Sequence, residues 1–458
     1  METNENFNLQ EEPVSTTNEK PKKKSNDKNS SMGLTAKGAI VGALILILLI
    51  PTSLISNLIK ERLKREEAVR EEVCSKWASE QTLAGPFLII PYNEPIHNPK
   101  GNGPQFEKKD CYILPEVLKI SGEIIPFQRH RSIYNITVYQ SDLTFNGAFP
   151  KIDLNSLNIP KENLLLNKAI LYFELSDFRG IEEQLEINWN GKKLTLGKEN
   201  TFTTTADYGL AALIELTPED LGKEHEFSLN IKLKGSQNLK FIPIGKTTET
   251  HLESPWTNPS FIGNFIPNNP AKISDKGFSA DWKILHLNLS FPQIWKGTTY
   301  NAYESSYGVT LLQSTDSYAK TDRSVKYAIL FIGLTFALYF FIEILQKRKV
   351  HPLQYVLVGI ALCIFYTLLL SIGEYLSFNW AYLISSAAII TLISLYTSSA
   401  FKSRKIACIF SFVLCTLYGF IFILIQLQDG ALLFGSIGLF ALLAAVMYYS
   451  RKIDWYKN

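Results

Sequence analysis

Apolar residues are concentrated in six long runs, one near the N-terminus and five in the C-terminal third of the chain. The runs cover residues 38–59, 327–345, 353–372, 379–400, 406–427 and 431–449. Each is close to the roughly 20 residues that a helix needs to cross the hydrocarbon core of a bilayer. The first run is too long, and begins too late in the chain, for a secretory signal peptide. The pattern therefore predicts an α-helical transmembrane bundle of six helices, one N-terminal and five C-terminal.

Between the first and second runs, apolar and polar residues alternate instead. In EFSLNIKLKGS at 226–236, apolar side chains occupy every second position from Phe227 to Leu233. This period of two is typical of half-buried strands, and the Gly-Ser pair before NLKFIPIG predicts a hairpin. Similar strands are predicted at 132–149, 169–175, 185–196 and 277–289, the third of these with an Asn-Gly turn.

A charged helix is predicted to precede these strands. Residues 60–80 contain Glu–Arg and Glu–Lys pairs spaced four apart, which stabilise a solvent-exposed helix. We expect this helix to continue the first apolar run outward and to end at Gly85-Pro86. The strands that follow predict a large β-rich domain, antiparallel and sandwich-like. The segment has room for two lobes, because a single sandwich uses only about 100 residues.

The basic residues predict the orientation in the membrane. Short connections after the second, fourth and sixth runs contain Lys and Arg, whereas the alternate loops at 373–379 and 428–430 contain none. Basic residues favour the cytoplasmic side, so both termini should be cytoplasmic. The basic residues just after the first run oppose this orientation, but a long translocated domain is less constrained by the rule.

Composition and motifs exclude several functions. A net charge of +3, with basic residues beside apolar runs, does not predict nucleic-acid binding. IGKTT at 244–248 lacks the first glycine of a P-loop, and neither HExxH nor G-x-S-x-G occurs. No Cys/His spacing indicates a metal. We therefore expect no catalytic, cofactor or metal residues. A hydrolase whose groups converge only in the folded chain is the remaining enzymatic alternative.

Two features of the β-rich region are candidate functional or structural sites. SPWTNPSFIGNFIP at 254–267 is dense in Pro, Gly and aromatic residues, and its Trp256, Phe261 and Phe265 could pack on a sheet or contact a partner. Cys74 and Cys111 are the two cysteines outside the apolar runs. They could form a disulfide on the oxidising side of the membrane or remain free thiols.

Glu343 interrupts the second apolar run near its end. A carboxylate at the centre of a bilayer would be a functional candidate because its burial is costly. Glu343 instead lies two residues before the predicted end, four residues before Lys347. We therefore expect a carboxylate at the membrane edge, solvated or paired with Lys347.

Several segments resemble the CreD family of bacterial inner-membrane proteins. They are SPWTNPSFIGNFIP at 254–267, SDFRGI at 176–181, SYAKTDRSVKYAILFIGLTF at 317–336, HPLQYVLVGIALCIFYTLLLSIGE at 351–374 and IDWY at 453–456. The resemblance extends from about residue 34 to the end of the chain. It implies a multi-pass protein with a periplasmic domain, associated with cell-envelope integrity, and it implies no known reaction and no catalytic residues.

With this resemblance the chain divides into five predicted parts. They are a disordered polar cytoplasmic tail (1–33), the first transmembrane helix (34–59), a periplasmic domain with an amphipathic helix and a β-rich part (60–325), a five-helix transmembrane region (326–450) and a cytoplasmic tail (451–458).

The leading functional hypothesis is a non-enzymatic envelope protein, whose β domain contacts an unidentified envelope protein or polymer while the helices lie in the lipid bilayer. The alternative is a transporter or channel-like protein. Its polar lining would be Thr335, Glu343, Ser371, Ser385, Ser386 and Gln426. A periplasmic enzyme acting on the envelope is a third, weaker hypothesis.

Overall fold

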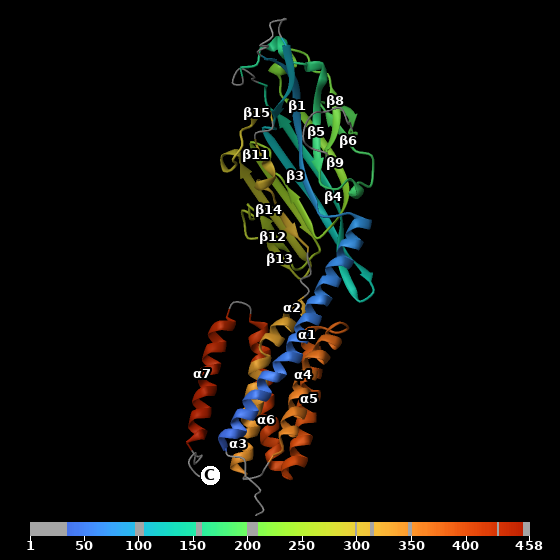
Figure 1. Ribbon diagram of the computed structural model, residues 1–458. Coiled ribbons are helices and arrows are strands. Elements are labelled where there is room, and N and C mark those ends of the chain that lie inside the picture. The colour runs from blue at the N-terminus through green and yellow to red at the C-terminus, as the bar shows by residue number, and fades with distance from the viewer. Residues whose placement is uncertain are drawn as a thin grey trace, which may run out of the picture.

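The structure is a computed structural model that describes residues 34–96, 105–152, 158–198, 209–297, 300–311, 316–346, 350–427 and 430–451. The predicted N-terminal tail, the basic loop containing Lys347 and most of the C-terminal tail lie outside these residues. A bundle of helices occupies one end of the molecule and a β domain occupies the other (Figure 1). This division matches the two hydrophobicity patterns in the sequence.

A single helix connects the two parts. α1 covers Leu34–Trp77, and Pro51 lies inside it without ending it. At 1.5 Å per residue a helix of this length spans about 66 Å, roughly twice the hydrocarbon thickness. The expected outward continuation of the first apolar run is confirmed. The predicted end at Gly85-Pro86 is wrong, because that pair lies inside strand β1, which begins at Gln81.

The β domain contains two eight-stranded sheets. The first sheet has β12 (Ser260–Gly263), β16 (Tyr307–Thr310), β10 (Asn238–Phe241), β1 (Gln81–Ile96), β2 (Gln105–Ile113) and β15 (Ile294–Lys296) in that order, with β5 (Ala169–Leu175) beside β1 and β8 (Gly209–Ile214) beside β5. The second has β13 (Lys272–Ser274), β14 (Gly277–Leu285), β11 (Thr247–Ser254), β3 (Val117–Arg131), β4 (Tyr134–Phe149), β9 (His225–Ser236), β6 (Glu186–Trp189) and β7 (Lys192–Thr195).

Short 3-10 helices connect several of these strands. They are η2 (Lys161–Asn163), η3 (Leu166–Lys168), η4 (Phe178–Gly180), η5 (Asp220–Gly222), η6 (His286–Asn288) and η7 (Ala302–Ser305).

Two expectations about strand pairing are corrected. β9 and β10 do not form a hairpin, because β9 lies in the second sheet and β10 in the first. The chain changes sheets at Gln237, whose φ is +60°. The domain is also not entirely antiparallel, since β1 pairs with β10 and β3 with β11 in parallel. The Asn-Gly turn is confirmed, with positive φ at both Asn190 and Gly191 between β6 and β7.

The two sheets share their buried side chains. Phe145 of the second sheet contacts Phe173 and Phe241 of the first at ring-centroid distances of 5.2 and 6.3 Å. Among the described residues, most buried apolar side chains of the two sheets form one cluster rather than two lobes, whereas Tyr134, Ile136 and Val138 of β4 belong to the cluster of the helices.

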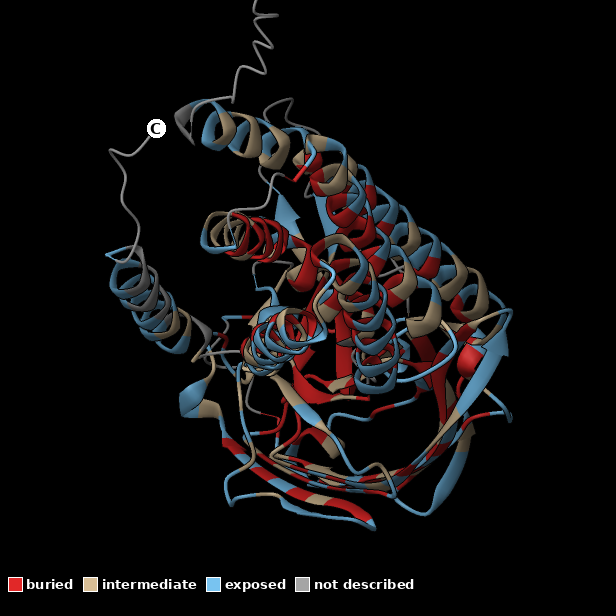
Figure 2. Ribbon diagram, turned by 90° about the horizontal axis from the view of Figure 1, so that it is seen from below, coloured by how far each residue is buried: buried red, intermediate tan, exposed pale blue. Residues whose placement is uncertain are grey.

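The helical end contains α2 (Asp316–Lys326), α3 (Ala328–Leu345), α4 (Pro352–Gly373), α5 (Phe378–Phe401), α6 (Arg404–Gln426) and α7 (Ala431–Ser450). Within the described part of the chain, five helices are long and apolar enough to cross a membrane: α1, α3, α4, α5 and α6. Seen from below, buried residues of these helices face one another and their outer faces are exposed (Figure 2). α7 forms where the sixth run predicts it and stands beside the bundle (Figures 1 and 2).

Candidate functional site

A row of polar side chains crosses the outer face of the second sheet. Lys119 of β3 is paired with Asn146 of β4, Asn146 with Ser228 of β9, and Ser228 with Asn188 of β6. Directly paired residues project from the same face of a sheet. The positions next to this row, such as Phe145 and Leu229, are buried in the core. The alternation that predicted the strands therefore also places these four polar side chains together.

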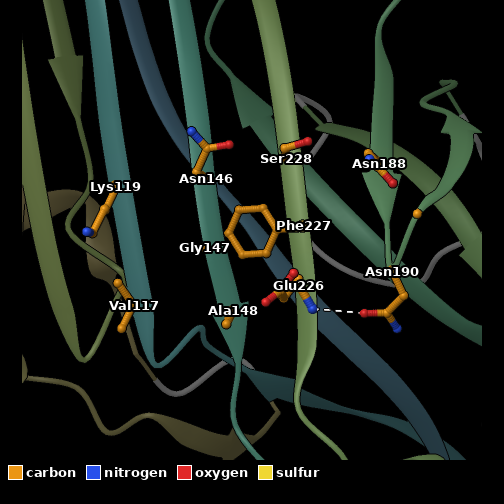
Figure 3. Close-up of a pocket in the computed structure, with 11 residues that line it drawn as sticks. Val117, Lys119, Asn146, Gly147, Ala148, Asn188, Asn190, Glu226, Phe227 and Ser228 are labelled. Carbon is orange, nitrogen blue, oxygen red and sulfur yellow. Dashed lines mark hydrogen bonds between the residues drawn. The ribbon is translucent and has the colours of Figure 1, made fainter.

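This row lines a groove of about 390 Å³, drawn in Figure 3. Glu226, Asn190 and Gly191 line one end of it. The Oδ1 atom of Asn188 is buried and accepts no hydrogen bond from any described residue. An unpaired buried acceptor is costly, so this oxygen is a candidate to accept a hydrogen bond from a ligand.

Asn190 is held in place by its neighbours. Its Oδ1 accepts a hydrogen bond from the backbone N–H of Glu226 at 2.9 Å, as marked in Figure 3. Nε2 of His225 lies 2.8 Å from the carbonyl oxygen of Asp220, which can only accept, so Nε2 carries the proton. Nδ1 of His225 then accepts from the amide of Asn190 at 2.8 Å. The His225 ring also stacks on Trp189.

The groove offers hydrogen bonds rather than reactive groups. Its amides and hydroxyl can both donate and accept, which suits a polar ligand such as a hydroxyl-rich polymer. Lys119 of the groove and the neighbouring Lys283 lie 3.9 and 2.9 Å from the carboxylate of Glu249. The hydrogen bond from Lys283 is the main cause of the lowered pKa of Glu249.

No group of three His, Cys, Asp or Glu side chains that could hold a metal occurs in the described residues.

The three aromatic residues proposed as a contact loop pack against the β core. Phe261 contacts Phe278 and Trp282 at centroid distances of 5.8 and 5.6 Å. Phe265 contacts Tyr307, and Trp256 donates its ring N–H to the carbonyl of Asn258. All three side chains are half-buried, so each still has some exposed surface.

In the same loop Ile266 is 76% exposed. A role of this loop in contacting a partner stays a prediction.

The suggested disulfide is absent. Cys74 and Cys111 are both free and buried. Cys74 lies in the last turns of α1 and belongs to the cluster of the helices, whereas Cys111 lies in β2 within the core of the β domain. Burial raises the pKa of the Cys111 thiol to about 12. The spacing along the chain could not have revealed that the two thiols lie in different cores.

The expectation for Glu343 is also corrected. The residue is only 5% exposed, and Oε1 lies 2.5 Å from Nζ of Lys37 near the start of α1. Oε1 also accepts from the backbone N–H of Val350 at 3.0 Å, and Oε2 accepts from the hydroxyl of Tyr355 at 2.9 Å. Glu343 is thus a buried connection between α1, α3 and α4. The suggested partner Lys347 lies outside the described residues.

The other end of α1 is attached to the β domain through the SDFRGI segment. Asp177 accepts a hydrogen bond from the backbone N–H of Ser79 at 2.8 Å, and Arg179 donates to the carbonyl of Ser75. Nη2 of Arg179 also lies 2.7 Å from Asp177. Burial alone would raise the pKa of Asp177, but hydrogen bonds from Arg179 and Ser79 outweigh it and lower the pKa to about 2.

Basic residues of the β3–β4 hairpin also contact α1. The Arg129 guanidinium lies 4.7 Å from the centre of the Trp77 ring, and Arg131 lies 3.2 Å from Glu72. These contacts add to those of Asp177 and Arg179, so the end of α1 is held by strand β3 and by the segment that connects β5 to β6.

Of the polar residues suggested as a transport lining, Glu343, Ser386 and Gln426 form hydrogen bonds within the described part of the bundle. Ser386 donates to the carbonyl of Leu383, Gln426 donates to Asn379, and Ser371 is exposed. Thr335 and Ser385 are fully buried, and their hydroxyls have no hydrogen-bond partner among the described residues.

Comparisons with known proteins identify the family. A family model described as "Inner membrane protein CreD" matches residues 33–456. Inner membrane protein CreD of Escherichia coli (strain K12) is 32% identical over 418 residues, which cover 90% of this chain and 91% of the relative.

Solved structures give only weak similarity. An M1 zinc metallopeptidase from Deinococcus radiodurans matches with 7% identity and a TM-score of 0.19, over 37% of this chain and 38% of that one. A two-domain mutant M1 zinc metallopeptidase bound to L-arginine matches with 8% identity and the same TM-score, over 37% and 39%. Neither likeness carries an argument about fold. The family model and the E. coli relative show that the chain belongs to the CreD family of multi-pass bacterial inner-membrane proteins.

Proposed function

We propose that the chain supports the integrity of the cell envelope without catalysing a reaction, by holding its β domain outside the inner membrane where it binds an envelope polymer or protein. In this proposal six helices cross the membrane, both termini are cytoplasmic, and residues 60–325 form a sandwich-like periplasmic domain.

The observation that carries this proposal is the attachment of α1 at both ends. Lys37 binds Glu343 within the bundle, and Ser75 and Ser79 at the far end bind Arg179 and Asp177 of the β domain. One continuous helix therefore holds the β domain at a set distance from the bundle (Figure 1). Such an arrangement suits a domain that must reach a component outside the membrane.

The groove of Figure 3 supports binding rather than catalysis. Its amide and hydroxyl groups suit recognition of a polar ligand, and Asn188 provides an acceptor with no internal partner. These side chains also lack the pairing of nucleophile and base by which most hydrolases are recognised.

Crosslinking in living cells tests the proposal. A photoreactive residue would replace Asn146 in the groove, Ile266 in the aromatic loop, or, as a matched exposed control, Asp275 near β13. Capture of a defined envelope polymer or protein from Asn146 or Ile266, but not from Asp275, is the expected result. Only self-crosslinks from both test positions would contradict it.

The transporter hypothesis is the second candidate, and one observation favours it. The buried hydroxyls of Thr335 and Ser385 in the bundle have no internal partner among the described residues, although burial of unpaired polar groups in a membrane is costly. Flux of a solute into proteoliposomes, lost in a Thr335→Val, Ser385→Ala double variant, would support transport. Capture of an envelope component by crosslinking, with no solute flux into proteoliposomes, would favour the envelope-binding proposal over transport.

A further inference from the structure

A second cavity in the β domain lies on the outer face of the first sheet. It has a volume of about 280 Å³. Its floor is formed by side chains of β1, β2 and β5, and its other wall by Trp295 of β15, by Gly297, and by residues 300–303 at η7. It shares no lining residue with the groove of Figure 3, which lies on the second sheet.

Six aromatic rings line this cavity, together with several aliphatic side chains. Trp295 stacks on Tyr112 with a centroid distance of 5.3 Å and an interplanar angle of 10°, and the edge of Tyr300 meets Trp295 at 5.9 Å. On the floor, Phe87 contacts Tyr172 at 5.3 Å. Tyr300 is 43% exposed, so the cavity has an open mouth lined by rings.

One carboxylate lies among these rings. Glu174 of β5 lines the cavity and accepts a hydrogen bond from the hydroxyl of Tyr303 at 2.7 Å. Burial raises the pKa of Glu174, and the hydrogen bond from Tyr303 opposes this only in part. In the described part of the chain no Lys, Arg or His forms a salt bridge with Glu174. Lys296 directly follows Trp295 on β15. Because successive side chains of a strand point to opposite faces, Lys296 does not share the face on which Trp295 lines the cavity.

Charge and ring geometry select one class of ligand. The faces of aromatic rings attract cations, and a partly desolvated carboxylate without a cationic partner does the same. An anion would be repelled by Glu174, and a neutral apolar ligand would bury the carboxylate further without compensation. We propose that this cavity binds an organic ammonium group, with Trp295 and Tyr300 against its alkyl surface and Glu174 as its counter-charge. The proposal goes beyond the envelope-binding role and does not depend on the groove of the second sheet.

Calorimetry on the purified full-length chain in detergent tests this inference. The probes are ethanolamine, choline and 3,3-dimethyl-1-butanol, the last of which has the shape of choline without its charge. We expect at least one of the two amines to bind about tenfold more tightly than the neutral alcohol, because a cation gains attraction to the ring faces and to the carboxylate that the uncharged alcohol lacks. Equal affinities for all three, or no binding of either amine, would overturn the proposal.

Two substitutions locate the binding. Glu174→Gln keeps an oxygen that can accept from Tyr303 but removes the charge, and Trp295→Leu removes the stacked ring. Each should weaken amine binding about tenfold or more. Glu186→Gln, at an exposed position of the second sheet, is the matched control and should leave the affinity unchanged. Circular dichroism and thermal melting of each variant verify folding. Unchanged amine affinity in a folded Glu174→Gln variant would refute the assignment.

Discussion

Lys37 and Glu343 are 306 positions apart in the sequence, and their side chains meet at 2.5 Å within the helical bundle. The Glu343 side chain is nearly inaccessible, whereas that of Lys37 is 24% exposed. Because both remaining contacts of Glu343 come from Val350 and Tyr355, one carboxylate connects the start of α1 to the end of α3 and the start of α4. The pair thus fixes the N-terminal part of the helix that supports the β domain.

Breaking this pair should destabilise the bundle. Glu343→Gln leaves Lys37 without its counter-charge, and Lys37→Met leaves the buried carboxylate without a cation. We expect each to lower stability by about 1–3 kcal/mol, below the cost for a fully buried pair because Lys37 is partly exposed. The measurement is thermal unfolding in detergent.

A double variant provides the control for this prediction. If the two side chains stabilise each other, the combined loss is smaller than the sum of the single losses. Glu61→Gln, at an exposed position of α1, should have little effect. If the loss of stability in the double variant equalled the sum of the two single losses, the interaction between Lys37 and Glu343 would contribute nothing to stability.

Acid should weaken the attachment of α1 to the β domain. The pKa of Asp177 is about 2 in the folded chain, below the value of about 3.9 expected in an unfolded one. A lowered carboxyl pKa stabilises the fold above the unfolded value, and this contribution is lost as the pH falls from about 4 to about 2. We expect a loss of about 1–2 kcal/mol after allowance for solvent screening.

Denaturant unfolding between pH 6 and pH 2.5 measures this loss. Asp177→Asn should be less stable than the unsubstituted chain at pH 6 and approach it near pH 2.5. Asp142→Asn, at an exposed position of β4, is the control and should follow the unsubstituted chain at every pH. A constant difference between Asp177→Asn and the unsubstituted chain across this range would contradict the assignment.

The sequence predicts the elements of this protein better than the contacts between them. Apolar run length identified the helices, and period-two alternation identified strands such as β4, β9 and β14, because both signals are local. The sheet change at Gln237 was missed, since a Gly-Ser pair between two strands has the same local pattern whether the strands pair or separate. The partner of Glu343 was missed because i,i+4 spacing can suggest Lys347 but not Lys37.

The candidate sites show the same limit. Polar residues at alternating positions of β3, β4, β6 and β9 were visible in the sequence, but their common register was not. The ring-lined cavity gave no signal at all, because Phe87, Tyr112, Glu174 and Trp295 come from four separate segments. The local density of aromatic residues is instead high in the loop at 254–267, which is why the sequence favoured that loop as a contact site.

The close packing around position 147, at the groove of Figure 3, should require a glycine. A Cβ added there would lie 2.2 Å from the carbonyl oxygen of Val117 and 2.5 Å from the Phe227 ring, so the backbone or the ring must move. We expect Gly147→Ala to destabilise the β domain by about 1–3 kcal/mol, the usual cost of overpacking. Gly222→Ala is the control, since nothing lies within 4 Å of its added Cβ. Equal melting temperatures for the two variants would contradict the tight packing at Gly147.

Cys74 and Cys111 should remain free thiols even under oxidising conditions. They belong to two different clusters of buried side chains, and Cys111 is fully buried with a pKa raised to about 12, so little of its thiolate is available for exchange. Maleimide labelling followed by peptide mass spectrometry should find both cysteines unlabelled in the folded chain and both labelled after denaturation without a reducing agent. A Cys74–Cys111 cross-linked peptide in the non-reduced digest would contradict this arrangement. It would also require the end of α1 to approach β2 closely, because a disulfide holds its two Cα atoms within about 7 Å.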